Sequence, residues 1–195
     1  MATVIDGTTG TSIAGASSTV GNFTVGGALQ VGGITTNLYP LVSGTSQTAP
    51  FTAPNTSADF TGIPSWVKRI TVMFNGVSTN GTSNPIVQIG AGSFTTTGYA
   101  SGSIESGNTR AAYTGGFGIL SGNASNLIYG QMVLTNISTT AWVSALNSVF
   151  DQGGVYYSVT GAGSISLGGT LDRVRITTVN GAPVFDAGTI NIMWE

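Results

Sequence analysis

The sequence predicts an all-β protein in which an N-terminal arm and a short β-stem are followed by an antiparallel, jelly-roll-like β-sandwich. Short runs rich in β-branched and aromatic residues recur at intervals of roughly 8 to 15 residues, separated by Gly, Asn and Ser turn signals. Apolar residues make up 41% of the chain, which is sufficient to form a core. Charged residues make up only 6%, so Thr, Ser, Asn and Gly must form most of the surface.

Residues 1–18 form the predicted arm. They are mostly small and polar, as in Gly7-Thr8-Thr9-Gly10, and they show no hydrophobic pattern. A segment of this composition has too few apolar side chains to order by itself. We therefore expect the arm to become ordered only against a partner.

Residues 19–56 are predicted to contain a Gly- and Val-rich β-stem and a Pro-containing connector. The apolar stem residues recur within a Gly-punctuated repeat of five to six residues and are Val20, Phe23, Val25, Leu29, Val31 and Ile34. Two or three such repeats cannot bury their own side chains, so identical chains wound around one another would supply the missing neighbours. A pair of ordinary β-hairpins with Gly turns is the alternative. Pro40, Pro50 and Pro54 disfavour continuous strand pairing in the connector.

Residues 57–195 form the predicted sandwich. In its first strand, residues 65–74, alternation places four apolar side chains on one face, namely Trp66, Ile70, Val72 and Phe74. The next strands are expected at residues 85–89, 111–120, 127–134, 142–150, 155–159, 171–177 and 188–194. Residues 142–150 could also form a helix, but their β-branched and aromatic content favours a strand.

Four short motifs are predicted to form the turns between these strands. Asn75-Gly76 and Asn80-Gly81 carry the strongest turn signals in the sandwich. Asp151–Gly154 and Phe185–Gly188 have the composition of turns as well. The first pair would separate the strand at 65–74 from the strand at 85–89.

Residue types that the chain lacks exclude several kinds of chemistry. Without histidine, no Ser-His-Asp or Cys-His nucleophile and no imidazole metal site can form. Without cysteine there is neither a disulfide framework nor a thiolate metal site. The glycines do not form a P-loop motif. We therefore expect no metal, no cofactor and no catalytic site.

A pair of carboxylates, as glycosidases use, needs only two of the acidic residues. Asp151 and Asp186 lie in predicted turns, whereas Asp172 neighbours Arg173 and Arg175 and is expected to form a structural ion pair. These local roles make a catalytic pair the less favoured interpretation, and the sequence predicts a protein that is not an enzyme.

The low content of basic residues limits the partners of the chain. Five basic residues and a net charge of −2 argue against binding to nucleic acid or to an anionic membrane surface. No stretch approaches the roughly 20 apolar residues of a membrane helix, and Met1–Asp6 does not resemble a secretory signal. We expect a chain made in a cytoplasm, although its neutral, hydrogen-bonding surface is typical of extracellular adhesins, fibres and shells.

Aromatic residues are the candidates for ligand binding, because sugars are held by aromatic faces with amides and hydroxyls beside them. The tyrosines in Gly-, Ser- and Thr-rich surroundings are Tyr99, Tyr113, Tyr156 and Tyr157. The alternative for each is a half-buried ring at a strand edge. Tyr156 and Tyr157 are adjacent, so they point to opposite faces of a strand and one of them is expected to be exposed. Trp66, Trp142 and Trp194 are expected in the core or at a subunit interface.

Two long segments resemble a module that recurs in phage and prophage tail-fibre-like proteins. They are residues 59–81, DFTGIPSWVKRITVMFNGVSTNG, and residues 171–192, which include LDRVRITTVNG and FDAGTINI. Together they bracket residues 57–195, and residues 1–12 and 21–36 resemble the particle-anchoring end and the stem repeats of such proteins more weakly. The resemblance implies a homotrimeric, non-enzymatic virion component with a β-rich C-terminal module, and it carries no ligand residues.

The sequence and the resemblance together predict a bacteriophage virion protein of short fibre type, assembled in the host cytoplasm. Its arm would dock on other virion proteins, its stem would join three chains, and its sandwich would meet a host cell-surface glycan. With 195 residues the chain is short for a tail fibre, which leaves a capsid decoration or head-fibre protein that stabilises the shell as the alternative. A carbohydrate-binding or carbohydrate-active protein is the second alternative.

Overall fold

The structure of the protein, a computed structural model, describes residues 29–31, 34–36, 41–51 and 55–195. The chain divides into two units, Met1–Leu38 and Tyr39–Glu195. The predicted arm at residues 1–18 lies outside the described residues. So do three of the candidate stem residues, Val20, Phe23 and Val25.

The described part of the first unit is an antiparallel hairpin. It consists of β1 (Leu29–Val31) and β2 (Ile34–Thr36), and Val31 pairs with Ile34. The other three candidate stem residues, Leu29, Val31 and Ile34, therefore belong to an antiparallel strand pair, as in the hairpin alternative. Whether copies of the hairpin pack against one another stays a prediction.

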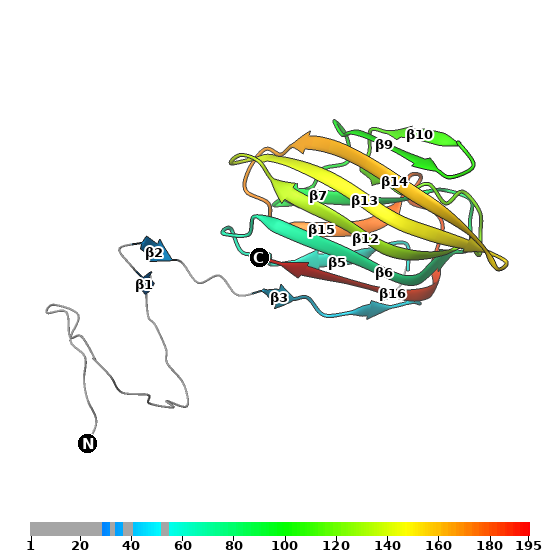
Figure 1. Ribbon diagram of the computed structural model, residues 1–195, viewed down its shortest axis with the longest axis horizontal. Coiled ribbons are helices and arrows are strands. Elements are labelled where there is room, and N and C mark those ends of the chain that lie inside the picture. Colours follow the sequence, from blue (N-terminus) through cyan, green and yellow to red (C-terminus); the bar gives the residue numbers. More distant parts are fainter. Residues whose placement is uncertain (1–28, 32–33, 37–40, 52–54) are drawn as a thin grey trace, which may run out of the picture. The chain divides into compact units, whose positions relative to one another are not determined.

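The second unit is an all-β sandwich of two antiparallel sheets, as the sequence predicted (Figure 1). The large sheet has nine strands: β3 (Val42–Ser43), β4 (Gln47–Thr48), β6 (Arg69–Thr79), β9 (Ala100–Glu105), β10 (Arg110–Tyr113), β12 (Leu127–Asn136), β13 (Ala141–Gln152), β14 (Val155–Ser166) and β16 (Phe185–Trp194). The small sheet has five: β5 (Ala58–Thr61), β7 (Pro85–Ala91), β8 (Ser93–Phe94), β11 (Phe117–Gly118) and β15 (Arg173–Thr178). None of the residues that the structure describes forms a helix capable of crossing a membrane.

The order of pairing is that of a jelly roll. Strand β4 pairs with β16, β5 with β15, β6 with β12 and β7 with β11, so the chain is a long antiparallel hairpin rolled into two sheets. Within each arm of this hairpin, β4–β7 and β11–β16, successive strands of the roll alternate between the large and the small sheet. Two insertions add to this plan, β8–β10 between β7 and β11, and β13–β14 between β12 and β15. The pairing of β14 with β9 joins the insertions and widens the large sheet beyond β12.

Alternation along the strands places the core between the sheets. In β6, Ile70, Val72 and Phe74 are at most 4% exposed, as the sequence predicted. Val72 lies between Ile192 of β16 and Met132 of β12, which are also buried. Each such side chain contributes roughly 1.5–3 kcal/mol by leaving water. The inner face of the large sheet therefore supplies much of the stability of the sandwich.

The tryptophans lie in or against this core. Trp142 in β13 is 2% exposed. Trp66 comes before β6 and not within it, because Ser65 and Trp66 form a turn and β6 begins at Arg69. Trp66 and Trp194 are half-buried and pack against the core cluster.

Two of the predicted turns are β-bulges inside long strands. Asn75-Gly76 lies within β6, and Phe185–Gly188 forms the beginning of β16. The β6–β16 register shifts twice between Phe185 and Thr189, and Gly76 and Gly188 have φ values of 64° and 86°. These turn predictions were wrong because a bulge needs the same left-handed backbone as a turn, and Gly supplies it in both. Asn80-Gly81 does lie in the β6–β7 turn.

The other differences concern strand boundaries. The strand predicted at residues 111–120 is divided into β10 and β11, which belong to different sheets. Strand β14 continues to Ser166, well beyond the predicted end at 159. Strands β3 and β4 pair with β16, so the sandwich begins within the predicted connector and not at residue 57.

Candidate functional site

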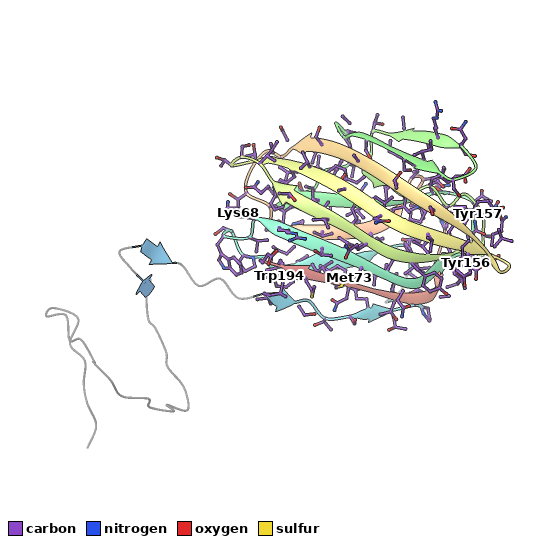
Figure 2. The ribbon with its side chains drawn as sticks, viewed as in Figure 1. Lys68, Met73, Tyr156, Tyr157 and Trp194 are labelled. Atoms are coloured by element: carbon purple, nitrogen blue, oxygen red, sulfur yellow. The ribbon has the colours of Figure 1, made fainter. Side chains whose placement is uncertain are left out.

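The large sheet has two ends that differ in what they present. At one end, which we call the Trp194 end, Trp194 pairs with Val42 of β3 and the backbone N–H of Asn136 donates to Lys68. At the other end, which we call the hairpin end, the β13–β14 turn projects from the sheet. Figure 2 shows Tyr156 and Tyr157 at the hairpin end, opposite Lys68 and Trp194. About ten residues of β13 separate the ends, roughly 33 Å at the rise of a strand.

A side-chain hydrogen bond closes the turn of the β13–β14 hairpin, and the hairpin carries a tyrosine on each face. The Asp151 carboxylate accepts the backbone N–H of Gly154 at 2.6 Å, which closes the predicted turn. Tyr156 lies on the outer face of the sheet and is 64% exposed. Tyr157 points to the inner face, where it pairs with Phe150, and the two rings stack with 5.0 Å between their centroids. One tyrosine of the pair is therefore exposed, as alternation predicted.

A cleft of about 260 Å³ lies beside the Tyr157 ring, and we call it the Tyr157 cleft. Three loops meet there: the β9–β10 turn, the β11–β12 loop and the β13–β14 hairpin. The lining combines two stacked rings with amides, hydroxyls and a carboxylate and consists of Glu105, Thr109, Leu120, Ser121, Gly122, Asn123, Phe150, Gln152 and Tyr157. Glu105 is the one carboxylate among these lining residues, and none of them is basic.

The β9–β10 turn holds the Glu105 carboxylate in place. Its two oxygens accept the backbone N–H groups of Gly107 and Thr109. Hydrogen bonds from the Thr109 side chain, and then from these two N–H groups, hold the pKa of Glu105 below its usual value. The carboxylate is thus anionic at neutral pH, and the turn fixes its position at the cleft before any ligand arrives.

The β11–β12 loop is fixed from the other side of the cleft. The Asn84 side-chain oxygen accepts the backbone N–H groups of Ser121 and Gly122 at 3.0 and 2.8 Å. The Asn126 amide donates to the Ser121 carbonyl at 2.7 Å, and Asn126 itself is buried. The wall of the cleft that carries Asn123 is therefore held by two asparagines that do not line it.

Two of the four candidate tyrosines are core residues and cannot contact a receptor. Tyr99 is 3% exposed, and its hydroxyl oxygen accepts the Ile89 N–H at 2.8 Å. Tyr113 is 6% exposed, and its hydroxyl lies 3.4 Å from that of Ser103. Burial raises the pKa of both phenols, that of Tyr99 to about 12. The predicted ligand contacts at Tyr99 and Tyr113 are therefore wrong, because the β8–β10 insertion folds these rings inward.

Tyr99→Phe tests this core role. The substitution leaves the Ile89 N–H without its partner, so we expect the free energy of unfolding to fall by about 1–3 kcal/mol at neutral pH. In the wild type, stability should fall further as the pH rises from 10.0 to about 12, because the folded state keeps the phenol proton that the unfolded chain loses. Urea unfolding at pH 7 and above pH 10 measures both effects. An unchanged alkaline loss in the variant would contradict this assignment.

The acidic residues that sequence reasoning weighed for catalysis do not line the cleft. Asp172 binds Arg173 through two hydrogen bonds of 2.7 and 3.0 Å, which is the expected ion pair. Asp172 precedes β15 of the small sheet, and Asp186 lies in β16 of the large sheet. Within the described ranges, no cluster of three acidic side chains suited to a metal ion occurs.

The outer face of the large sheet is a second candidate surface. Two cross-strand rows run over its centre: Asn191, Met73, Gln131, Asn147, Thr160 and Ile104, then Met193, Thr71, Val133, Ala145, Ala162, Gly102 and Ala112. Neither row contains a charged residue, although Arg110 at the β10 edge pairs with Ile104. Figure 2 labels Met73, which lies on β6 toward the β16 side of this face.

The outer side of the small sheet has the opposite character. Arg175 forms two hydrogen bonds of 2.6 and 2.7 Å with Asp59, and its guanidinium lies 4.1 Å from the centre of the Phe94 ring. Arg173 lies over the same ring at 5.6 Å. The two sides of the sandwich therefore differ, since one carries a network of charges and the other is nearly uncharged at its centre.

Sequence reasoning identified Tyr157 but missed the rest of the cleft. The signal for Phe150 was its position opposite Tyr157 once the Asp151–Gly154 turn was accepted, because a hairpin turn fixes the register of its strands. Glu105 and Asn123 carried no such signal. No family model, curated protein or solved structure matches the chain.

Proposed function

We propose that this chain is a structural protein of a bacteriophage particle, of short fibre type and not an enzyme. It would be anchored through its N-terminal segment and would present the sandwich for attachment to the host surface. The observation that carries the proposal is that the two ends of the sandwich differ. The first strand of the sandwich joins the large sheet at the Trp194 end, and the Tyr157 cleft lies at the opposite end. A protein anchored by its N-terminal segment would thereby turn its aromatic cleft away from the particle.

The composition of the chain supports this proposal further. Only 12 of 195 residues are charged, 5 basic and 7 acidic. Hydroxyl and amide groups must therefore form most of the hydrated surface. Such a surface attracts neither polyanions nor anionic membranes and permits close packing of neighbouring subunits. The resemblance of residues 59–81 and 171–192 to tail-fibre-like proteins points in the same direction.

The outer face of the large sheet is our proposed contact between copies in a homotrimer. In a trimer this face would lie toward the three-fold axis and contact two neighbouring copies, and an uncharged face can do so without repulsion between like charges. From the spacing of strands and residues, the two rows and their neighbours cover roughly 30 by 27 Å, about 800 Å². The face is therefore about as large as the roughly 800 Å² that one partner contributes to a standard interface, and in a trimer it would be divided between two neighbours. Three copies would also raise a modest affinity for the host surface through avidity.

Labelling intact particles with an antibody against the chain tests the proposed function. We expect the label on the tail and a loss of adsorption by particles that lack the protein. Label on the head, with normal adsorption but lower resistance to heat or osmotic shock, would identify a capsid decoration or head-fibre protein instead. Cleavage of a host polysaccharide by the purified chain would indicate a carbohydrate-active protein and contradict the proposal.

A further inference from the structure

We propose that the Tyr157 cleft binds a single uncharged pyranose unit of a host-surface glycan, with the sugar ring against Tyr157 and its hydroxyls on Glu105, Asn123 and Gln152. This inference rests on the proposed role in host attachment and names the ligand class of that site. Tyr156, Tyr99 and Tyr113 take no part in it.

The size of the cleft suits one sugar ring. At about 260 Å³, it is slightly smaller than the 300 Å³ or so at which pockets for larger organic ligands begin. Phe150 stacks on the Tyr157 ring with an angle of 17° between the planes, which sets the orientation of Tyr157. A ring held in this way offers a preformed apolar surface to the C–H face of a pyranose, so little conformational entropy is lost on binding.

The polar groups of the cleft suit sugar hydroxyls. Amides such as Asn123 and Gln152 both donate and accept, which matches a hydroxyl that does the same. A carboxylate has about four acceptor positions, and the N–H groups of Gly107 and Thr109 and the Thr109 side chain use three of them. The Glu105 carboxylate therefore keeps acceptor capacity for a ligand.

The charge of the cleft selects against acidic sugars. Glu105 has no basic residue beside it among the lining residues. The nearest cation in sequence, Arg110, donates to Asn108 at 3.0 Å and does not line the cleft. A uronic or sialic acid would bring a second carboxylate toward Glu105 without a cation to offset the repulsion. The cleft therefore favours neutral hexoses and N-acetylated hexosamines.

The adjacent tyrosines provide a matched test. The purified full-length chain is applied to immobilised oligosaccharides ending in glucose, galactose, N-acetylglucosamine, glucuronic acid or sialic acid. We expect binding to at least one neutral sugar at millimolar concentration and at least about tenfold weaker binding to the acidic ones. Tyr157→Ala should lower the affinity by about tenfold, whereas Tyr156→Ala, on the opposite face of the same strand, should change it less than about twofold.

Two further variants guard against loss of folding. Tyr157→Phe keeps the ring stack and should retain most of the affinity, and Asn123→Ala in the exposed loop should weaken it by about threefold or more. Glu105→Gln should reduce the discrimination against acidic sugars. Equal losses in Tyr156→Ala and Tyr157→Ala, a preference for acidic sugars, or no binding to any neutral sugar would each overturn the inference.

The particle experiment separates this inference from the proposed function. If particles carrying Tyr157→Ala adsorb as well as the wild type while particles lacking the chain do not, the attachment role stands and the cleft is not its receptor site. If the chain is absent from particles but the purified protein shows the expected sugar specificity, the cleft assignment stands and the virion role is wrong.

Discussion

Gly188→Ala is expected to prevent the sandwich from forming. Gly188 has a φ of 86°, in the left-handed region that L side chains avoid. A Cβ atom there would overlap the carbonyl group of Gly76 and the backbone nitrogen of Val77. Both groups belong to the bulged part of β6, so a rotamer change cannot relieve the clash. The two bulges can face each other only because Gly188 lacks a side chain.

The cost of this substitution should exceed the stability of the domain. Separating β16 from β6 would open the strand pair that holds Ile190 and Ile192 in the core, and small domains are stable by only about 5–15 kcal/mol. We expect insoluble or unfolded protein, seen as the absence of a cooperative urea transition and of β-sheet circular dichroism.

Gly62→Ala is the matched control. Gly62 also has a positive φ, 76°, but a Cβ there would meet nothing within 4 Å. This variant therefore carries the conformational penalty alone, about 1–2 kcal/mol, and should fold. If Gly188→Ala proved as stable as Gly62→Ala, the contact between the two bulges would not exist as described.

The same glycines show where prediction from sequence reached its limit. The strand predicted at residues 188–194 lies within β16, where alternation places Ile190 and Ile192 in the same core. The sequence at Asn75-Gly76 predicted a reversal of the chain, yet β6 continues to Thr79. Local chemistry specifies a left-handed residue, but whether the chain turns or bulges depends on the strand that lies opposite.

The jelly-roll class could be predicted from spacing, but the widening of the large sheet could not. Strand β9, with the sequence ASGSIE, has few of the side chains that favour strands, and it pairs with β14, whose residues lie more than 50 positions later. Only the tertiary pairing makes it a strand. The ion pair between Asp59 and Arg175 has the same origin, because their strands are adjacent in space and 116 residues apart in sequence.

The candidate site follows the same logic. Tyr157 could be identified because its local surroundings resemble those of sugar-binding aromatics. Glu105 and Asn123 reach the cleft through two other loops, and each loop is shaped by its own hydrogen bonds. When three loops form a site, the sequence predicts only those residues whose type and neighbours are typical of ligand binding.

The predicted effect of a charge on the outer face is large because the face has none at its centre. Ala145 lies in the middle of β13, between Val133 of β12 and Ala162 of β14, and it is exposed in the single chain. If three copies meet through this face, Ala145→Glu buries an unpaired carboxylate at each contact, at a cost of roughly 3 kcal/mol or more. A trimer should then become a monomer at micromolar concentration, which light scattering coupled to gel filtration would detect.

Ala182→Glu is the control for net charge, because Ala182 is exposed in the β15–β16 loop, away from that face. It should leave the trimer intact. Neither substitution should change the free energy of unfolding of the sandwich, measured in urea, by more than about 0.5 kcal/mol. A wild-type chain that is monomeric, or a trimer that survives Ala145→Glu, would show that copies do not meet here. This face of alanines, valines and neutral polar residues would then be expected to bind a different partner, because the charged side chains of the described residues lie on the small sheet, at the ends of the strands and at the β10 edge.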